Sequence, residues 1–388
     1  MGIIVPILLI IVSCLIIWRA CNGFDTASRY IGRNLSDGVR GATINAISSS
    51  IPELFTTAFF LLFLKDTNGF SAGIGTTAGS AVFNAVVIPA LVIIVVTFFL
   101  KKEYIYISKK VILRDGISLI IAEIILIILI TGDTLLWWHG FILMITYFVY
   151  IFFMLSTMSK KVGIKEKDEF EISTNNDNRI QSIFKLDLEN LIVGKSQITK
   201  KNAWQLLISS TFIIGISCLL LVAACEMISL EYYTLPFFGE LKGLNIPILF
   251  VAVILASAAT SVPDTIISIR DAKSGEYNDA ISNALGSNIF DICFALGLPL
   301  FLYCIFYGPV QMDTDTVKFS SELRILLLII TIVVFLIFYI GKYMTKTKGI
   351  LLFSIYFSFI TYIISLSLGM KWAESISNQI SKIFFFLI

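Results

Sequence analysis

Long apolar stretches separated by short polar segments run from one end of the chain to the other. Because a helix needs about 20 apolar residues to cross the roughly 30 Å hydrocarbon layer of a bilayer, each stretch predicts a transmembrane helix. The predicted spans cover residues 3–18, 42–64, 72–100, 112–131, 136–157, 203–225, 246–269, 280–306, 324–341 and 349–368. The pattern therefore predicts an all-α polytopic membrane protein with ten transmembrane helices.

One long polar segment, residues 158–202, separates the fifth predicted span from the sixth. It is rich in charges of both signs, and this composition suits a linker better than a packed domain. The segment divides the ten spans five and five. We therefore expect a first five-helix repeat over residues 1–157, a linker over 158–202, and a second five-helix repeat over 203–388.

Composition agrees with a chain whose main solvent is lipid, since 57% of its 388 residues are hydrophobic and only 14% are charged. The net charge of +2 comes from basic residues scattered over many segments. A nucleic-acid-binding surface needs those residues in one patch or stripe, so we expect no nucleic-acid partner.

The placement of basic residues predicts which side of the bilayer the linker occupies. When alternate loops are assigned to one side, most of the 29 Lys and Arg residues, with Arg29 and Arg270 among them, fall on the linker side. Lys318 and Arg324 fall in loops on the opposite side. The positive-inside rule then places the linker in the cytoplasm and both termini outside. We expect the cell membrane as the location.

The first span lacks the basic start and cleavage site of a signal peptide, so we expect it to be retained.

A motif occurs once in each half of the chain. Residues 49–53 are Ser-Ser-Ile-Pro-Glu and are followed at 79–84 by Gly-Ser-Ala-Val-Phe-Asn; residues 260–264 are Thr-Ser-Val-Pro-Asp and are followed at 286–291 by Gly-Ser-Asn-Ile-Phe-Asp. An odd number of spans separates the copies, so the second copy is predicted to lie upside down relative to the first. Inverted repeats of this kind are typical of alternating-access transporters.

Three acidic residues, Glu53, Asp264 and Asp291, fall inside predicted spans. A carboxylate at the centre of a transmembrane helix costs at least a few kcal/mol, so such residues usually mark an ion pathway or binding site. The spacing of the motifs supports a shared site, since residues four apart lie on one face of a helix. The pairs with this spacing are Ser49 and Glu53, Thr260 and Asp264, Ser80 and Asn84, and Ser287 and Asp291.

The ligands that these side chains offer are all oxygen atoms, which suit hard cations such as Ca²⁺, Na⁺ and K⁺. Zinc or copper would favour His or Cys ligands, but the single histidine, His139, lies near a predicted helix end and is interpreted as a bystander. Another acid, Glu123, lies in the fourth span outside both motifs, and we interpret it as a buried hydrogen-bond partner.

Proline and glycine positions favour the same site. Pro52 and Pro263 each precede an acid by one residue and remove a helical hydrogen bond, which frees backbone carbonyls to face a cation. Gly75, Gly79 and Gly286 would let neighbouring helices approach closely. The segments of Glu53 and Asp264 would then pack against those of Ser80 and Ser287.

At these motifs, together with Gly41-Ala-Thr and residues 54–56, the sequence resembles the calcium/cation antiporter superfamily, and within it most closely the potassium-dependent sodium/calcium exchangers. The resemblance implies a ten-helix fold in which Glu53 and Asp264 are the principal calcium ligands. It implies that the ions are surrounded by Ser49, Ser50, Glu53, Ser80, Asn84, Thr260, Ser261, Asp264, Ser287 and Asp291. This sequence departs from the family pattern at Ser48 and Ala259, where glycine is usual, and at Ala81, where asparagine is frequent.

The resemblance implies a secondary antiporter that exchanges Ca²⁺ for Na⁺ and needs no cofactor. Three carboxylates can be neutralised by three Na⁺, by Ca²⁺ with a proton, or by Ca²⁺ with K⁺, so K⁺ co-transport is left open. A proton/Ca²⁺ antiporter is the main alternative, because clustered acids can carry protons. A cation channel is less favoured. The sequence shows no arrangement of a nucleophile with a base that would suggest an enzyme. The oligomeric state is not predicted.

Overall fold

Helices make up most of the structure, a computed structural model that describes residues 2–33, 39, 41–156, 179–194, 197–236, 238–341 and 343–387. In the first half the elements are α1 (Ile4–Ile31), η1 (Gly41–Asn45), α2 (Ala46–Ser49), α3 (Ile51–Leu64), α4 (Asp66–Ile94), η2 (Val95–Phe99), α5 (Lys109–Leu129), β1 (Thr134–Leu135) and α6 (Trp137–Ser156). Between the halves lie α7 (Arg179–Phe184) and α8 (Leu188–Ile192). The second half contains α9 (Lys200–Ser229), β2 (Tyr232–Leu235), β3 (Gly239–Lys242), α10 (Ile248–Val251), η3 (Ala252–Ala256), α11 (Ser257–Thr260), α12 (Val262–Lys273), α13 (Tyr277–Phe290), η4 (Asp291–Ala295), α14 (Gly297–Tyr307), β4 (Val310–Gln311), α15 (Thr314–Tyr339), α16 (Lys346–Ser367) and α17 (Lys371–Leu387).

Within these described ranges, eight helical stretches are long and apolar enough to cross a membrane. They are Ile4–Ile31, Asn68–Phe99, Trp137–Ser156, Lys200–Ser229, Ile248–Lys273, Tyr277–Tyr307, Thr314–Tyr339 and Lys346–Ser367. A ninth is obtained if the bent pair Gly41–Ser49 and Ile51–Leu64 is counted as one span.

The fourth predicted span, residues 112–131, is helical as α5 but is not among these apolar stretches. Arg114, Asp115 and Glu123 lower its apolar character. Asp115 and Glu123 are buried against the rest of the bundle, and Arg114 pairs with Asp115 at 2.6 Å. The three charges within the apolar part of this helix therefore have partners or surroundings in the protein, whereas Lys109 and Lys110 at its start are exposed.

Two of the predicted boundaries were wrong because charged residues continue the helices. The first span was expected to end near residue 18, but α1 extends to Ile31 and includes Arg29. The ninth was expected to start at Arg324, but α15 starts at Thr314 and buries this arginine. In both cases the charge has partners within the protein: Arg29 pairs with Asp25, and the Arg324 guanidinium donates to the Ser320 carbonyl at 2.9 Å.

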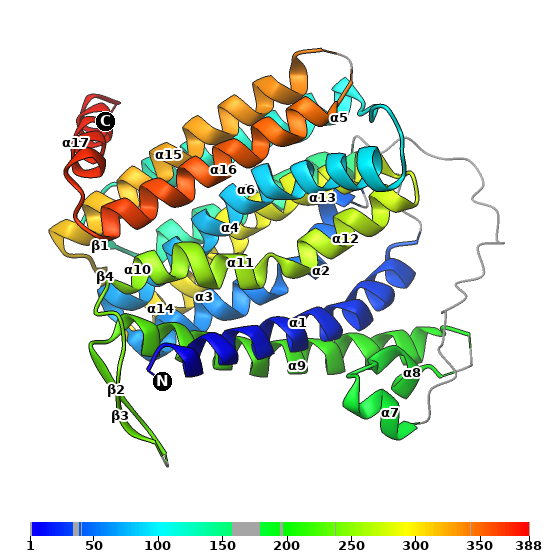
Figure 1. Cartoon of the computed structure of the whole chain (residues 1–388), viewed down its shortest axis with the longest axis horizontal. Helices are drawn as coiled ribbons and strands as arrows, with labels where there is room; N and C mark the ends of the chain where they lie inside the picture. Colours follow the sequence, from blue (N-terminus) through cyan, green and yellow to red (C-terminus); the bar gives the residue numbers. More distant parts are fainter. Residues whose placement is uncertain are drawn as a thin grey trace.

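Both halves contain the same succession of elements. The segment η1–α2–α3 consists of a π-helical turn, a short α-helix, a one-residue break and a longer α-helix. The segment η3–α11–α12 has the same order, and each of its elements starts the same number of residues after its counterpart in the first half. The breaks are at Ser50 and Ser261, and each is followed two residues later by proline. In Figure 1 the chain runs from α2 at the right to α3 at the left, but from α10 at the left to α12 at the right. The two interrupted helices therefore run in opposite directions.

Two glycines bring these interrupted helices against the helices that carry the second part of each motif. A Cβ atom on Gly79 of α4 would lie 2.3 Å from the carbonyl oxygen of Val253 in η3. On Gly286 of α13 it would lie 2.7 Å from the Cα atom of Ala42 in η1. Only glycine allows backbones to approach so closely. The close approach that the sequence predicted is present at both positions.

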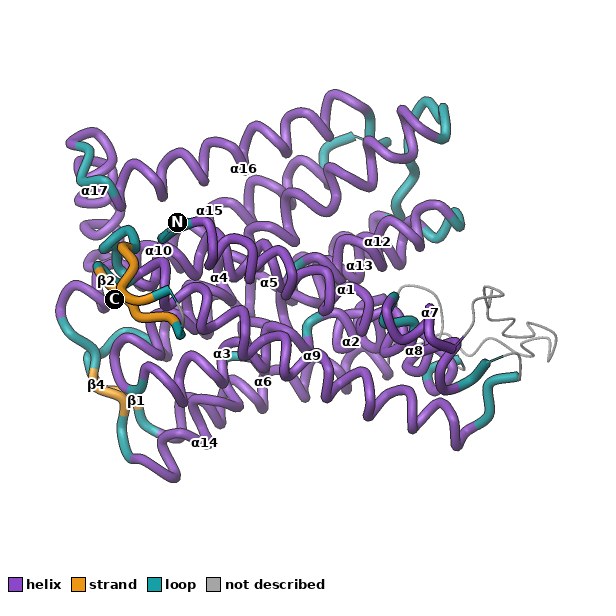
Figure 2. Tube along the Cα trace, turned by 60° about the horizontal axis from the view of Figure 1, so that its bottom comes forward, coloured by secondary structure: helices purple, strands orange, loops and turns teal. Residues whose placement is uncertain are grey.

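The two ends of the bundle differ. At one end, antiparallel pairs β1–β4 and β2–β3 lie near α17, while α7 and α8 lie at the other end (Figure 2). Helix α8 packs on α1 and α9, where Leu188 and Val193 join their apolar core. Part of the expected linker thus packs on the bundle; its residues 158–178 and 195–196 lie outside the described residues. Helix α17 was not predicted from the sequence.

We predict that Gly79→Ala and Gly286→Ala lower the melting temperature of the purified protein, because each added methyl group overlaps a backbone and overpacking typically costs about 1–3 kcal/mol. Gly215→Ala in α9 is the matched control, since its Cβ would lie 3.7 Å from the Phe55 ring, an ordinary contact. Thermal unfolding in detergent measures the effect. Melting temperatures equal to that of Gly215→Ala would contradict this account of the helix packing.

Candidate cation-binding site

The structure gathers all ten predicted site residues in the interior, and each is 0% exposed. They come from four segments near the middle of the bundle: Ser49, Ser50 and Glu53 at the α2–α3 break, Ser80 and Asn84 in α4, Thr260, Ser261 and Asp264 at the α11–α12 break, and Ser287 and Asp291 at the junction of α13 and η4. Two segments from each half of the chain therefore contribute to one polar centre.

The hydroxyl group of Ser80 connects the two halves. Its Oγ lies 3.0 Å from Glu53 Oε1, 3.2 Å from Asp291 Oδ2 and 2.8 Å from the Ser261 hydroxyl. The Asn84 amide approaches the same oxygen at 3.4 Å. Two carboxylates from opposite halves therefore lie within hydrogen-bond distance of a single hydroxyl oxygen.

Asp264 forms the other part of the centre. Its Oδ1 accepts a hydrogen bond of 2.5 Å from Ser287, and its Oδ2 accepts one of 3.4 Å from the Asn84 amide. The Ser287 hydroxyl lies 3.4 Å from that of Ser49. Asn84 thus links this part to Ser80, and one continuous network joins eight of the ten predicted residues. The other two lie beside its acids: the Thr260 hydroxyl donates to the Ala256 carbonyl at 3.1 Å and lies next to Glu53, and the Ser50 hydroxyl lies next to Asp291.

The network has more oxygen acceptors than hydrogen-bond donors. A serine hydroxyl has one proton, so Ser80 can donate to only one of the oxygens around it. Ser49 and Thr260 direct their hydroxyl protons to backbone carbonyls of their own helices. The buried atoms without a hydrogen-bond partner include three acceptors, Glu53 Oε2, Asp291 Oδ1 and Asn84 Oδ1, and one hydroxyl, that of Ser50. Unpaired oxygens of this kind are costly in a protein interior, and a bound cation would satisfy them.

Acidic groups alone do not complete a coordination shell. Over the described ranges, no three His, Cys, Asp or Glu side chains are grouped closely enough to hold one metal ion. A cation at this centre would therefore take ligands from the hydroxyl and amide oxygens between the carboxylates. This composition suits hard cations that accept mixed oxygen ligands.

Asn283 is a polar residue of the centre that sequence reasoning missed. Its Nδ2 donates to the Ser268 hydroxyl at 2.9 Å and to the Asp264 carbonyl at 3.3 Å, and its Oδ1 lies 3.4 Å from the Ser49 hydroxyl. Asn283 precedes Ser287 by four residues on the same helix. The spacing rule applied to the motifs would have found it if extended one turn before them.

The end of the centre nearest α8 is closed by ion pairs. Asp25 in α1 pairs with Arg29 at 2.9 Å and with Arg270 of α12 at 2.7 Å. Arg29 also pairs with Asp271 at 2.7 Å, and Asp271 accepts a hydrogen bond of 3.0 Å from the Asn45 amide. Arg29 and Arg270 had been assigned to loops on the linker side. The structure places them in helices, where they hold α1, η1 and α12 together.

His139 and Glu123, which were not expected to bind ions, lie outside this network. The Nδ1 atom of His139 accepts a hydrogen bond of 2.9 Å from the backbone N–H of Leu136 at the start of α6. Glu123 accepts a hydrogen bond of 2.7 Å from the Thr331 hydroxyl of α15. The interpretation of Glu123 as a buried hydrogen-bond partner is confirmed.

Sequence comparisons relate parts of the chain to named exchangers. Sodium/potassium/calcium exchanger 1 of Gallus gallus is 33% identical over 124 residues, which are 31% of this chain and 18% of the relative. Sodium/potassium/calcium exchanger Nckx30C of Drosophila melanogaster is 36% identical over 104 residues, which are 27% of this chain and 12% of the relative. The matched region thus spans less than a fifth of either curated relative.

Structural comparisons extend over nearly the whole chain. A structure of the sodium-calcium exchanger NCX_Mj matches with a TM-score of 0.55 and 21% identity, covering 94% of this chain and 98% of the other. The H⁺/Ca²⁺ exchanger CAX matches with a TM-score of 0.63 and 13% identity, covering 100% and 92%. At these identities the comparisons establish a shared fold, that of polytopic helical membrane proteins.

The family comparison covers most of both halves. The model described as "Sodium/calcium exchanger protein" matches residues 5–156 and 202–365, leaving out only the ends and the segment between the halves. The resemblance inferred from the two motifs is confirmed. The chain is an integral membrane protein that belongs to the sodium/calcium exchanger protein family.

Proposed function

We propose that the protein is a secondary antiporter that exchanges Ca²⁺ for Na⁺ by alternating access around the buried oxygen network. The observation that carries the proposal is the surplus of acceptors at this network. Glu53 Oε2 and Asp291 Oδ1 are buried without a hydrogen-bond donor, and Ser80 is shared between the two side chains. Carboxylates in this environment need cations or protons as partners.

Ca²⁺ and Na⁺ are the cargo that this arrangement suits best. Three carboxylates give a formal charge that three Na⁺ neutralise completely, or that Ca²⁺ neutralises together with one monovalent cation. Exchange between these states never leaves a large net charge in the membrane. The ligand set that we propose is the ten residues predicted from the sequence, with Glu53 and Asp264 as the principal calcium ligands.

We infer an architecture of ten transmembrane helices in two inverted repeats of five, residues 1–157 and 203–388, joined by a linker over 158–202. Here α5 is the tenth span, since its 21 residues suffice to cross the bilayer and its buried charges face protein partners. The segments η1–α2–α3 and η3–α11–α12 have the same order of elements and run in opposite directions, which supports an inverted arrangement of the two halves (Figure 1). In such transporters, one half rocks against the other around a fixed midplane site.

The positive-inside rule supports a cell-membrane protein with a cytoplasmic linker and both termini outside. The ion pairs among Asp25, Arg29 and Asp271 would then close the cytoplasmic end of the site. The proposed cycle requires this end to open in turn, since alternating access exposes the site to one side at a time.

Proton/Ca²⁺ exchange is the second candidate function, favoured by the structural similarity to the exchanger CAX. The sequence similarity to sodium/potassium/calcium exchangers favours Na⁺ coupling instead. A channel is less favoured because the ten site residues are buried between the two halves, whereas channels build selectivity from open filters. The site contains carboxylates, hydroxyls and amides in a hydrogen-bonded network, an arrangement that supports ion binding more than enzymatic chemistry.

The proposed function predicts that Glu53→Gln or Asp264→Asn abolishes calcium uptake into proteoliposomes, because each change removes a principal ligand charge with little change of volume. Glu123→Gln is the matched control: it also neutralises a buried acid, but one whose partner is Thr331, away from the network. The control should retain uptake. Normal uptake by either site variant would refute the ligand assignment.

Coupling to Na⁺ predicts that reversing an imposed Na⁺ gradient reverses the direction of calcium flux in the same liposomes. The three-carboxylate site exchanges one cargo for the other, so the Na⁺ gradient sets the direction. Calcium uptake driven by a pH gradient, with Na⁺ absent on both sides, would favour the proton-coupled alternative.

Potassium dependence is predicted from Asp291, which stands where the first repeat has the neutral Asn84. We propose that Asp291 holds K⁺ beside Ca²⁺, because the Coulomb attraction offsets part of the dehydration cost of the ion. Na⁺-driven calcium uptake should therefore rise with K⁺ in the wild type and lose this dependence in Asp291→Asn. Indifference of the wild type to K⁺ would assign Asp291 the other role, that of a protonated ligand.

A further inference from the structure

A line of buried polar side chains leads from the cation-binding network toward the linker side of the bundle. Asn283 of α13 lies next to the network, and its amide nitrogen donates to the Ser268 hydroxyl at 2.9 Å. Asp271 follows three residues after Ser268 on the same face of α12. Asn45 of η1 lies against it, because its amide nitrogen donates to Asp271 Oδ2 at 3.0 Å. These four buried side chains connect the network with the ion pairs at the end of the bundle.

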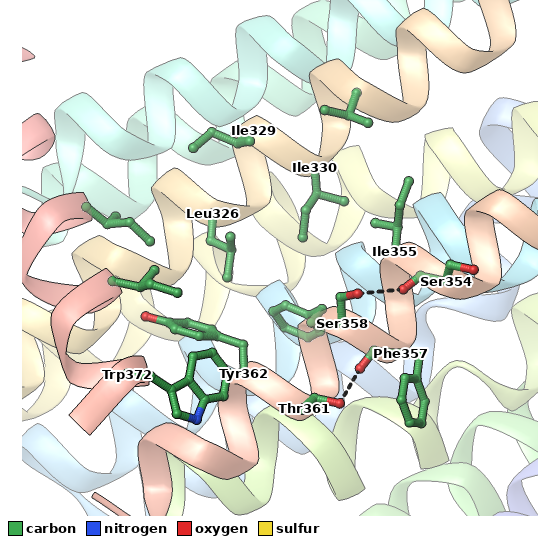
Figure 3. Close-up of a pocket in the computed structure, with 14 residues that line it drawn as sticks. Leu326, Ile329, Ile330, Ser354, Ile355, Phe357, Ser358, Thr361, Tyr362 and Trp372 are labelled. Atoms are coloured by element: carbon green, nitrogen blue, oxygen red, sulfur yellow. Dashed lines mark hydrogen bonds between the residues drawn. The ribbon is translucent and has the colours of Figure 1, made fainter. Parts of the chain in front are cut away.

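Polar groups on the outer surface of the bundle are arranged differently. The groove between α15 and α16 has 14 lining residues, and none of them is charged. Its hydroxyl groups are engaged within their own helix: Ser358 donates to the Ser354 carbonyl at 2.9 Å, and Thr361 donates to the Phe357 carbonyl at 2.8 Å (Figure 3). This groove offers a cation no charged partner, so the buried line is the better candidate for an ion pathway.

Arg29 places a positive charge at the end of this line, between two carboxylates. Its Nε atom pairs with Asp25 Oδ1 at 2.9 Å, and its Nη2 atom pairs with Asp271 Oδ1 at 2.7 Å. Both acids are 1% exposed, whereas the arginine side chain is 18% exposed. The acids come from different halves of the chain, α1 and α12. One guanidinium group therefore occupies the position between them that a metal cation would take.

Asn45 adds an oxygen atom that the ion pairs do not satisfy. Its Nδ2 atom donates to Asp271, whereas its Oδ1 atom is buried and has no hydrogen-bond partner among the described residues. Both atoms belong to one planar amide group, so the unpaired oxygen lies close to the Asp271 carboxylate. A buried oxygen without a donor is costly, and a hard cation held by the carboxylate would satisfy it.

The two carboxylates would differ once Arg29 left them. Asp25 would keep a basic partner, because its Oδ2 atom pairs with Arg270 at 2.7 Å. Among the ion pairs of the described residues, Asp271 has Arg29 alone as its partner. Release of this arginine would therefore leave Asp271 as an uncompensated acid beside the unpaired oxygen of Asn45. Carboxylate and amide oxygens are ligands that Ca²⁺ accepts, with water completing its shell.

We propose that Asp25, Asp271 and Asn45 form a second, weaker binding site for Ca²⁺ on the linker side. Arg29 competes for this site as a tethered cation and fills it while the linker side is closed. When that side opens, the guanidinium group leaves, and Ca²⁺ passes between this site and the network along the buried polar line. The role of the site in transport rests on the proposed function, whereas its affinity for calcium is measurable without transport.

Equilibrium dialysis with radioactive calcium tests the site in a chain whose network cannot bind the ion. In the Glu53→Gln, Asp264→Asn double variant, adding Arg29→Gln should create one calcium site per chain. We expect a Kd of about 10⁻³ M, the weak end of the range for calcium sites. Adding Asp271→Asn as well should abolish this binding, because it removes the principal carboxylate.

Arg33→Gln in the same double variant is the matched control. It removes a basic charge four residues later, but this exposed guanidinium group donates to the Tyr30 carbonyl at 2.7 Å. The control should therefore create no calcium site. The proposal fails if folded Arg29→Gln protein binds no calcium, if the control binds as much, or if the binding survives Asp271→Asn. Thermal unfolding of each variant identifies those that are folded.

Sided transport kinetics test the same site in an otherwise unchanged chain. Asp271→Asn keeps the shape of the side chain and should raise the KM for calcium supplied on the linker side about fivefold, the contribution of one ion pair near a surface. The KM on the other side should stay the same. If Asp271 only held the linker side closed, its loss would favour opening and lower the linker-side KM. That result, or an unchanged KM, would overturn the proposal.

Failure of the proposed function has a different signature. A wild-type chain that shows no Na⁺-driven calcium flux would refute the antiport proposal and leave the sided kinetics without a signal. The dialysis experiment would still decide whether Arg29 occupies a calcium site, because it measures binding at equilibrium.

Discussion

The structure depends on a mismatch between buried acceptors and donors. Glu53, Asp264 and Asp291 lie in the interior of an apolar bundle, where hydroxyl and amide groups supply too few protons for their oxygens. A soluble protein could hydrate such a centre, but a membrane-embedded one has to satisfy it with protons or cations. The same mismatch that would destabilise a bundle without ligands makes the site attractive to ions.

The fold maintains this mismatch by bringing two halves of the chain into close contact. Breaks at Ser50 and Ser261 interrupt the motif helices at the network, while Gly79 and Gly286 lack the side chains that would hold the neighbouring helices apart. Ser80 then reaches acids from both halves. Since the hydroxyl lies between the two halves of the chain, a relative movement of the halves would change the ligands around a bound ion. The proposed transport cycle would thereby link ion binding to conformational change.

Local patterns predicted much of this arrangement. Eight of the ten site residues follow from four-residue spacing in a repeated motif, the family resemblance adds Ser50 and Ser261, and the structure buries them all together. Features that depend on distant contacts were missed. The length of α1 follows from pairing of Asp25 and Arg29 with Arg270 and Asp271, residues far apart in the sequence. In the same way, α5 carries buried acids because Arg114 pairs with Asp115 and Thr331 donates to one oxygen of Glu123, contacts that hydrophobicity alone does not reveal.

Equilibrium binding to the purified protein tests the central claim most directly, because it requires no assumption about gradients or direction. Radioactive calcium and increasing Na⁺ would be added to the wild type and to a Glu53→Gln, Asp264→Asn double variant. The account predicts that Na⁺ displaces Ca²⁺ completely and steeply, since several Na⁺ replace one Ca²⁺ at shared ligands, and that the double variant binds no calcium. Calcium binding that is insensitive to Na⁺, or that persists in the double variant, would contradict it.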